Sequence, residues 1–192
     1  IFAAKPLAKE YQFNPEWKIN ASNPVLKQSD KNQMYFHLGQ TLGYFTEDGD
    51  ITHYQTFPSK VSISDKYYAV YDSNAQNIPF YFSNGSPAGK IEKSGYPYFK
   101  KDLIYIFLPG GNSFSKCSET GNIKWSYEGT MPITAFATND RFTATGLADG
   151  TIHIFNNADG EILSTFVPGG SDYPVILGID ISNDGQYVAS IS

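Results

Sequence analysis

Positive charge, cysteine and long apolar runs are all scarce in this sequence. The chain carries one arginine, Arg141, and a formal net charge of −5. Nucleic acids and anionic membrane surfaces are bound through clustered Lys and Arg, so this composition argues against both as partners. No apolar run approaches the ~20 residues of a membrane span, which argues against membrane insertion. The single cysteine, Cys117, excludes an intrachain disulfide and leaves the redox compartment open.

Catalytic and metal-binding signatures are also missing. The sequence holds no Gly-x-Ser-x-Gly elbow, P-loop or dinucleotide fingerprint. His37, His53 and His153 lack the convergent spacing of a metal site, so we interpret them as ordinary polar-face side chains. Cys117 lies in a strand-like run and is expected to be a structural thiol. We therefore predict no enzyme activity, no cofactor and no metal site.

The sequence is rich in strand and turn residues instead. Tyr and Phe occur 14 times each, which favours strands, and 17 Gly and 11 Pro residues interrupt the chain. The clearest stretch, residues 141–166, alternates apolar and polar side chains in three runs separated by Asp149-Gly150 and Asp159-Gly160. Asp-Gly between such runs is a strong hairpin signal, because glycine adopts a positive φ without steric cost. The stretch therefore predicts three antiparallel strands joined by tight turns.

This unit recurs along the chain. Turn glycines at positions 49, 85, 121 and 160 are 36, 36 and 39 residues apart, and matching strand patterns surround each of them. Each unit is predicted to hold four short strands, a pattern typical of β-propeller blades; a β-sandwich, the alternative, would not repeat at this period. The strand patterns cover residues 34–38, 50–54, 60–63, 67–71, 88–91, 96–99, 103–107, 122–127, 133–137, 141–145, 151–155, 161–166, 175–181 and 186–191.

The predicted fold class is therefore all-β, a β-propeller of four-stranded antiparallel blades, with about four and a half blades in this chain. Residues 1–24 are predicted to be an N-terminal extension or a closing strand, with apolar Tyr11, Phe13, Trp17 and Ile19 at alternate or near-alternate positions. Residues 25–192 form the blades, in units near 25–57, 58–94, 95–131, 132–170 and an incomplete 171–192.

The repeats resemble those of WD40-like and quinoprotein-like (PQQ-repeat) propellers. The run from Thr120 to Trp125 is similar to the end of a PQQ-type repeat, and the run from Ile179 to Ala189 resembles the opening of a WD40-type blade. The resemblance implies the fold and is uninformative about function. No Trp-Asp dipeptide closes a unit and no Gly-His opens one, and the periodic Trp of PQQ-binding dehydrogenases has one counterpart, Trp125.

About four and a half blades do not close a ring of the usual size. We therefore expect a larger propeller, in which the ring is completed by sequence beyond residue 192 or by a second chain. The start at Ile1 has two readings, which are an exported domain that has lost a signal or anchor, or an arbitrary boundary.

Aromatic side chains supply most of the candidate binding residues. Tyr and Phe crowd the second and third units, and those not needed between blades can form a recognition face, since aromatic residues are favoured at interfaces. Two Pro-Gly-Gly loops, at 108–113 and 166–171, are further candidates, because propeller loops carry binding. The candidate binding residues are Tyr96, Tyr98, Trp125 and Arg141.

The function that this pattern favours is a non-catalytic scaffold that binds a partner protein. Resemblance to envelope propellers with PQQ-type repeats implies a periplasmic or otherwise extracytoplasmic place in a bacterial cell envelope, with the cytoplasm as the alternative. The alternative function is a propeller enzyme, or a cofactor- or sugar-binding module with its site in the central channel. The scarcity of His and Arg counts against that alternative.

Overall fold

The computed structural model describes residues 14–20, 23–29, 31–170 and 172–192, and the regular elements of this part are all β-strands. They form five sheets, which we call blades 1 to 5. Blade 1 contains β1 (Gln33–Leu38), β2 (Thr41–Thr46) and β3 (Ile51–Thr56). Blade 2 contains β4 (Lys60–Ile63), β5 (Tyr67–Tyr71), β6 (Ile78–Phe82) and β7 (Pro87–Ile91), and blade 3 contains β8 (Tyr96–Lys100), β9 (Leu103–Phe107), β10 (Ser113–Cys117) and β11 (Ile123–Glu128). Blade 4 contains β12 (Ile133–Thr138), β13 (Phe142–Leu147), β14 (Ile152–Asn156) and β15 (Ile162–Phe166). Blade 5 contains β16 (Gly178–Ile181) and β17 (Val188–Ile191).

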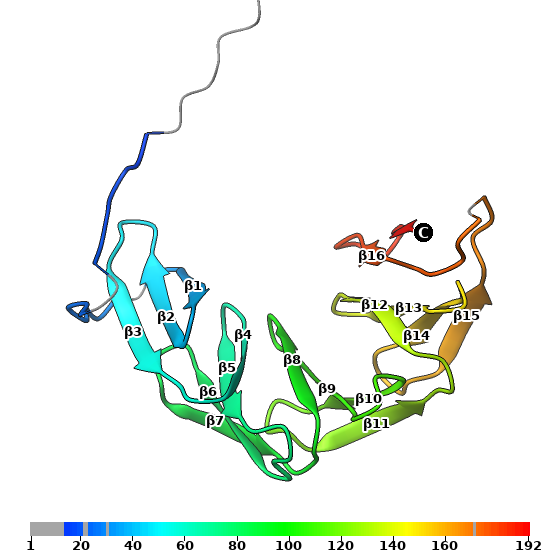
Figure 1. Cartoon of the computed structure of the whole chain (residues 1–192), viewed down its shortest axis with the longest axis horizontal. Coiled ribbons are helices and arrows are strands. Elements are labelled where there is room, and N and C mark those ends of the chain that lie inside the picture. Colours follow the sequence, from blue (N-terminus) through cyan, green and yellow to red (C-terminus); the bar gives the residue numbers. More distant parts are fainter. Residues whose placement is uncertain (1–13, 21–22, 30, 171) are drawn as a thin grey trace, which may run out of the picture.

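Blades 2, 3 and 4 are four-stranded antiparallel meanders, in which the order of strands in the sheet is their order in the chain. The blades follow one another along an open arc (Figure 1). The first strands, such as β4 and β8, face the concave side, and the last strands, such as β7 and β11, lie on the convex side. This arrangement confirms the predicted fold class of β-propeller blades.

Blade 1 departs from the four-strand prediction. Its sheet has three strands among the described residues, in the order β1-β2-β3. Residues 23–29 lie beside β3 instead, where Leu26 forms an isolated parallel bridge with Ile51 and Lys27 N donates a hydrogen bond to Ile51 O at 2.8 Å. Blade 5 has its first two strands, and its first strand begins at Gly178 rather than at the predicted residue 175.

The described N-terminal residues pack against the turn that joins β2 to β3. Trp17 Nε1 donates a hydrogen bond to Glu47 O at 2.9 Å, and the indole covers Gly49. Two alternatives were predicted for residues 1–24, an extension or a closing strand, and the described residues 14–20 form no strand. Tyr11 and Phe13 lie outside the described residues.

The hairpin turns have the geometry that the Asp-Gly pairs predict. Gly150 and Gly160 have φ values of 87° and 81°, and each amide closes its turn on a carbonyl of the preceding strand. Asp149 Oδ1 and Asp159 Oδ1 accept hydrogen bonds from backbone amides two residues further on, at 3.0 Å each. The carboxylates therefore stabilise the turns locally.

A ring from the preceding blade lies on the turn glycine of the next. His53 of blade 1 covers Gly85 of blade 2, and Trp125 of blade 3 covers Gly160 of blade 4. A Cβ atom on Gly85 or Gly160 would lie 2.8 or 2.6 Å from that ring, so a larger residue does not fit without a shift. Glycine is thus required both for the turn and for the close approach of neighbouring blades.

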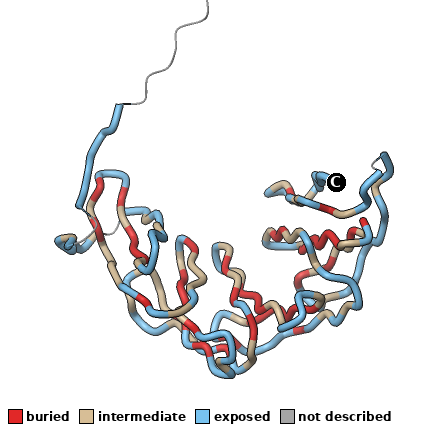
Figure 2. Tube along the Cα trace, viewed as in Figure 1, coloured by how far each residue is buried: buried red, intermediate tan, exposed pale blue. Residues whose placement is uncertain are grey.

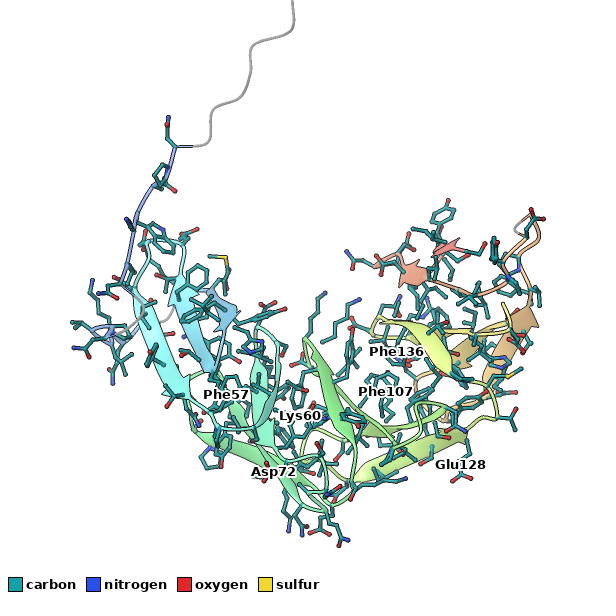
Figure 3. All side chains as sticks on the ribbon, viewed as in Figure 1. Phe57, Lys60, Asp72, Phe107, Glu128 and Phe136 are labelled. Atoms are coloured by element: carbon teal, nitrogen blue, oxygen red, sulfur yellow. The ribbon has the colours of Figure 1, made fainter. Side chains whose placement is uncertain are left out.

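The hydrophobic core lies between blades rather than within any single one. Figure 2 shows buried segments along each blade, and the apolar clusters join adjacent sheets. Between blades 3 and 4, the Phe107 and Phe136 rings meet edge to face with centroids 4.9 Å apart (Figure 3). Burying one such side chain contributes about 1.5–3 kcal/mol. Between blades 2 and 3, the fully buried side chains include Ile78, Phe80, Ile91, Ile104 and Ile106.

Candidate functional site

The antiparallel meander gives every blade two different ends. Hairpins between the first and second strands and between the third and fourth strands share one end, which we call the turn end. The other end, which we call the loop end, carries the second-to-third connections and the links between blades. The loop end comprises the described residues 39–40, 57–59, 72–77, 92–95, 108–112, 129–132, 148–151, 167–170 and 172–177.

Both Pro-Gly-Gly sequences lie at the loop end, in the connection 108–112 and in the connection formed by residues 167–170 and 172–177. The second connection is anchored near its end by Ile176, which is fully buried. Its side chain packs closely against Gly146, where an added Cβ atom would lie 2.3 Å from it. The anchored loop nevertheless exposes Val167 (61%) and Leu177 (70%). Tyr173 in the same loop is 80% exposed.

Two of the predicted site residues, Tyr96 and Tyr98, lie on β8 at the concave side of the arc. Tyr96 is 41% exposed at the loop end, with Lys60 Nζ 4.8 Å from its ring centroid. Tyr98 is half-buried, and its ring meets Phe136 edge to face at 5.2 Å. Burial, with a smaller contribution from Asp180, raises the pKa of the Tyr98 phenol.

A cleft of about 420 Å³ opens between β4 and β8 beside Tyr98. Because these strands face the concave side, the cleft lies on the concave side of the arc. Its walls combine aromatic, hydroxyl and charged groups, which include Tyr35, Ser62, Ser64, Asp65, Tyr98, Lys100 and Lys101.

Trp125 has a packing position between blades 3 and 4. It is 8% exposed, its indole stacks on Phe155 with centroids 5.9 Å apart, and its Nε1 donates a hydrogen bond to Asn157 O at 3.1 Å. Beside it, the Tyr105 hydroxyl is 2.7 Å from Thr143 Oγ1 in a buried polar network. The burial of Trp125 makes it a contact between blades and removes it from the surface.

Arg141 lies at the turn end of blade 4. Its guanidinium carbon is 4.8 Å from the ring centroid of Phe142, and its backbone carbonyl accepts a hydrogen bond from Asn157 N at 2.9 Å. Arg141 lines a pocket of about 390 Å³ together with Lys116 and Lys124. The four predicted residues are therefore spread over both ends and a buried seam, and they do not form one site.

The histidines and the cysteine occupy separate places. His53 is half-buried, and burial lowers its pKa. Cys117 is buried as expected, and desolvation raises the pKa of its thiol to about 12. Within the described ranges, no three His, Cys, Asp or Glu residues are placed to hold a metal ion. The same ranges contain no helix that is long and apolar enough to cross a membrane.

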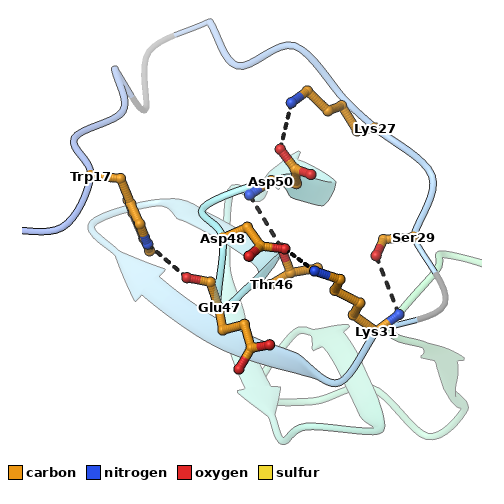
Figure 4. A network of polar contacts seen from close by, with 8 residues as sticks. All are labelled: Trp17, Lys27, Ser29, Lys31, Thr46, Glu47, Asp48 and Asp50. Atoms are coloured by element: carbon orange, nitrogen blue, oxygen red, sulfur yellow. Dashed lines mark hydrogen bonds and ion pairs between the residues drawn. The ribbon is translucent and has the colours of Figure 1, made fainter.

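The acidic turn at residues 47–50 is held by the chain's own lysines (Figure 4). Lys27 Nζ lies 2.5 Å from Asp50 Oδ1, and Lys31 pairs with Asp48. Such exposed ion pairs contribute little stability. They do show that these carboxylates tie the N-terminal segment to blade 1.

One family model, described as a beta-propeller protein, matches the chain over residues 1–192. The chain belongs to this beta-propeller family. An uncharacterized protein of Treponema pallidum (strain Nichols) is 30% identical to this propeller protein over 200 residues, which cover 98% of the chain and 53% of the relative. The propeller protein thus spans about half the length of this curated relative.

Solved propellers share the fold of this propeller protein at low sequence identity. The crystal structure of Hsv2 from Kluyveromyces marxianus superposes with a TM-score of 0.66 at 16% identity, covering 85% of this chain and 55% of Hsv2. Hsv2 from Kluyveromyces lactis gives a TM-score of 0.66 at 15% identity, over 86% of this chain and 57% of the other. These likenesses establish the fold alone.

The sequence prediction for this propeller protein includes neither Lys116 nor Lys124. Lys116 sits inside the otherwise buried strand β10, and a lysine in a buried strand was the available signal. Lys116 and Arg141 line one pocket only because blades 3 and 4 pack together. The pattern of strands along the sequence does not reveal this packing. Ile176 lies in the strand predicted for residues 175–181, because the sequence pattern does not reveal that its side chain packs against Gly146.

Proposed function

We propose that this propeller protein is a non-catalytic scaffold that binds a partner protein at its loop end. The connection between β15 and β16 carries the proposal, because it exposes the apolar side chains of Val167 and Leu177, the latter directly after buried Ile176. A residue next to such an anchor is preorganised and loses little conformational entropy on binding. Exposed apolar and aromatic side chains are typical anchors of protein interfaces.

Site-specific photo-crosslinking in the native cells tests this proposal. A photoreactive residue at position 167 or 177 is expected to give one discrete protein adduct, because these side chains lie on the binding surface. The matched control is position 123 at the turn end, where Ile123 is also exposed at 42%. Equal adducts at 167 and 123, or none at 167 and 177, contradict the proposal.

The repeats are proposed to be of the PQQ type. Support comes from Trp125, whose indole packs between blades, the role that the resemblance implies for the periodic Trp of such repeats. The ring is proposed to be completed by further blades of the same polypeptide, with a second chain as the alternative. The greater length of the Treponema relative supports the first of these.

We place the protein on the extracytoplasmic side of a bacterial cell envelope, with the cytoplasm as the alternative. This placement rests on the resemblance to envelope propellers with PQQ-type repeats. Fractionation of cells that produce the full-length protein, with protease accessibility of spheroplasts, decides between the two. Recovery in the cytoplasm, protected from protease, would overturn it.

A second function is a sugar- or cofactor-binding module, or an enzyme, with its site in the central channel. The cleft beside Tyr98 favours it, because Tyr35 and Tyr98 provide aromatic surface next to hydroxyl and charged groups. Calorimetric titration with a panel of neutral sugars tests this function, with Tyr98→Ala as the variant. Binding that Tyr98→Ala abolishes would favour the channel site over the scaffold.

A further inference from the structure

Lys116 occupies a position that is aromatic in the other blades. It lies five residues before the turn glycine Gly121, as its three counterparts lie five residues before theirs. All three counterparts are fully buried. Blade 3 therefore places a cation where its neighbours place an aromatic ring, and the neighbouring rings are those of Tyr44, Phe80 and Phe155.

This lysine is buried without an acidic partner. It is 8% exposed, and its Nζ donates a hydrogen bond to Asn157 O at 2.9 Å. None of the described carboxylates forms an ion pair with it, whereas four exposed lysines elsewhere do have such pairs. Burial of an unpaired charge is unfavourable unless a counter-ion is supplied. Desolvation, with a smaller contribution from Lys124, accordingly lowers the pKa of Lys116.

Two more cations line the same pocket at the turn end. Lys116, Lys124 and Arg141 surround a space of about 390 Å³, which also includes one carboxylate, that of Asp140. Neither Lys124 nor Arg141 pairs with a carboxylate in the part of the chain that the structure describes. The pocket therefore has two uncompensated positive charges in a chain with a net charge of −5.

The pocket is built from fixed backbone. Asn139 Oδ1 accepts hydrogen bonds from the amides of Arg141 and Phe142 at 2.9 and 2.8 Å. The Arg141 carbonyl is bonded to Asn157 N, and the Asn157 carbonyl receives the Lys116 ammonium. Asn157 thus binds the Lys116 ammonium and the backbone of Arg141, so the ammonium and the backbone around the pocket need little ordering by a ligand.

We propose that this pocket binds a small soluble phosphate ester. A phosphate dianion matches the two uncompensated charges, and Arg141 offers the planar fork that recognises phosphate oxygens in pairs. The overall negative charge of the chain repels extended polyanions and anionic surfaces, but it does not exclude a small ligand from a local positive pocket. The pocket lies at the turn end, so this inference stands apart from the proposed partner surface at the loop end.

Thermal unfolding and calorimetric titration with glycerol 3-phosphate test the proposal. The ester is expected to bind the 192-residue chain and to raise its thermal midpoint. Lys116→Met and Arg141→Gln are expected to weaken binding at least tenfold, while Lys60→Met at the loop end leaves it unchanged. Lys116→Met should itself be at least as stable as the wild type, because an apolar side chain then fills a position that is aromatic in other blades.

Three outcomes would overturn the proposal. One is an equal rise of the midpoint in wild type and Lys116→Met, and another is the absence of binding at 10 mM ester, a concentration roughly matched to weak anion sites. The third is Lys116-dependent binding to vesicles containing phosphatidic acid, or to a poly-glutamate peptide, that is tighter than binding of the ester. Vesicle binding would assign the pocket to a lipid headgroup, and peptide binding would assign it to an acidic partner.

Discussion

Single glycines set how closely neighbouring blades approach. Gly160 has a φ of 81°, and an added Cβ would lie 2.6 Å from the Trp125 ring. Gly160→Ala therefore combines backbone strain with a steric clash, and we expect it to lower the free energy of unfolding by about 2–4 kcal/mol. Urea denaturation measures this change.

Gly169→Ala is the matched control for that substitution. An added Cβ at Gly169 meets no atom within 4 Å, and the residue lies in an exposed loop. We expect a change within about 0.5 kcal/mol. Similar effects of the two substitutions would contradict both the backbone strain and the clash with Trp125 at Gly160.

The half-buried His53 makes stability depend on pH. Burial lowers its pKa in the folded state, so the unfolded chain binds a proton more readily as the pH falls below about 6.5. The contribution of neutral, half-buried His53 to the free energy of unfolding is complete above about pH 6.5. It is lost as the pH falls from about 6.5 to the lower pKa of the folded state. We expect the loss of unfolding free energy between pH 7.5 and 5.5 to be smaller in His53→Gln than in the wild type. Equal losses would place the pH dependence elsewhere.

Sequence alone could anticipate the residue types at the turns but not the residues of the pocket. Asp149 and Asp159 act locally, on amides two residues away, and local rules predict such contacts. The pocket joins Lys116 and Lys124 of blade 3 to Arg141 of blade 4, so it exists only once the two blades have packed. Trp125 was a candidate surface residue because its burial also depends on the neighbouring blade.

At the scale of elements, the N-terminal segment is a docked piece outside the sheets. Trp17 covers Gly49 and is 39% exposed. We expect Trp17→Ala to release the segment and to raise hydrogen–deuterium exchange of the amides at residues 45–50, with a small effect on global stability. Trp125→Ala, which empties a buried site, is expected to cost about 3–5 kcal/mol in global stability. Exchange at 45–50 that does not change in Trp17→Ala would contradict this docking.

Strands and hairpins could be predicted well where the chain contains Asp-Gly turns and period-two alternation. Blade 4 follows this pattern, and its strands begin and end within two residues of the prediction. Residues 14–20 also alternate, but they form no strand, and Trp17 instead contacts the turn of blade 1 through its side chain. Residues 175–177 are apolar because buried Ile176 anchors the connection ahead of β16. An apolar run alone does not distinguish such an anchor from a strand.

At the scale of the whole molecule, the arc leaves the edge of β1 unpaired by any described strand. Unpaired edges favour association with other strands. If further blades complete the ring, a polypeptide as long as the Treponema relative is expected to unfold at a higher temperature than the 192-residue chain and to remain monomeric. Differential scanning calorimetry and light scattering measure both properties. A longer polypeptide that is no more stable would favour completion by a second chain.

The Trp17 contact also bears on the order in which the fold is assembled. In stacked repeats, each unit is covered by its neighbours, as Gly85 and Gly160 are covered by rings of the preceding blade. Trp17 precedes blade 1 in the chain, so it is synthesised before the turn that it covers. A nascent chain therefore already contains the ring that covers Gly49 when the turn between β2 and β3 is made, so this cover does not depend on any later blade.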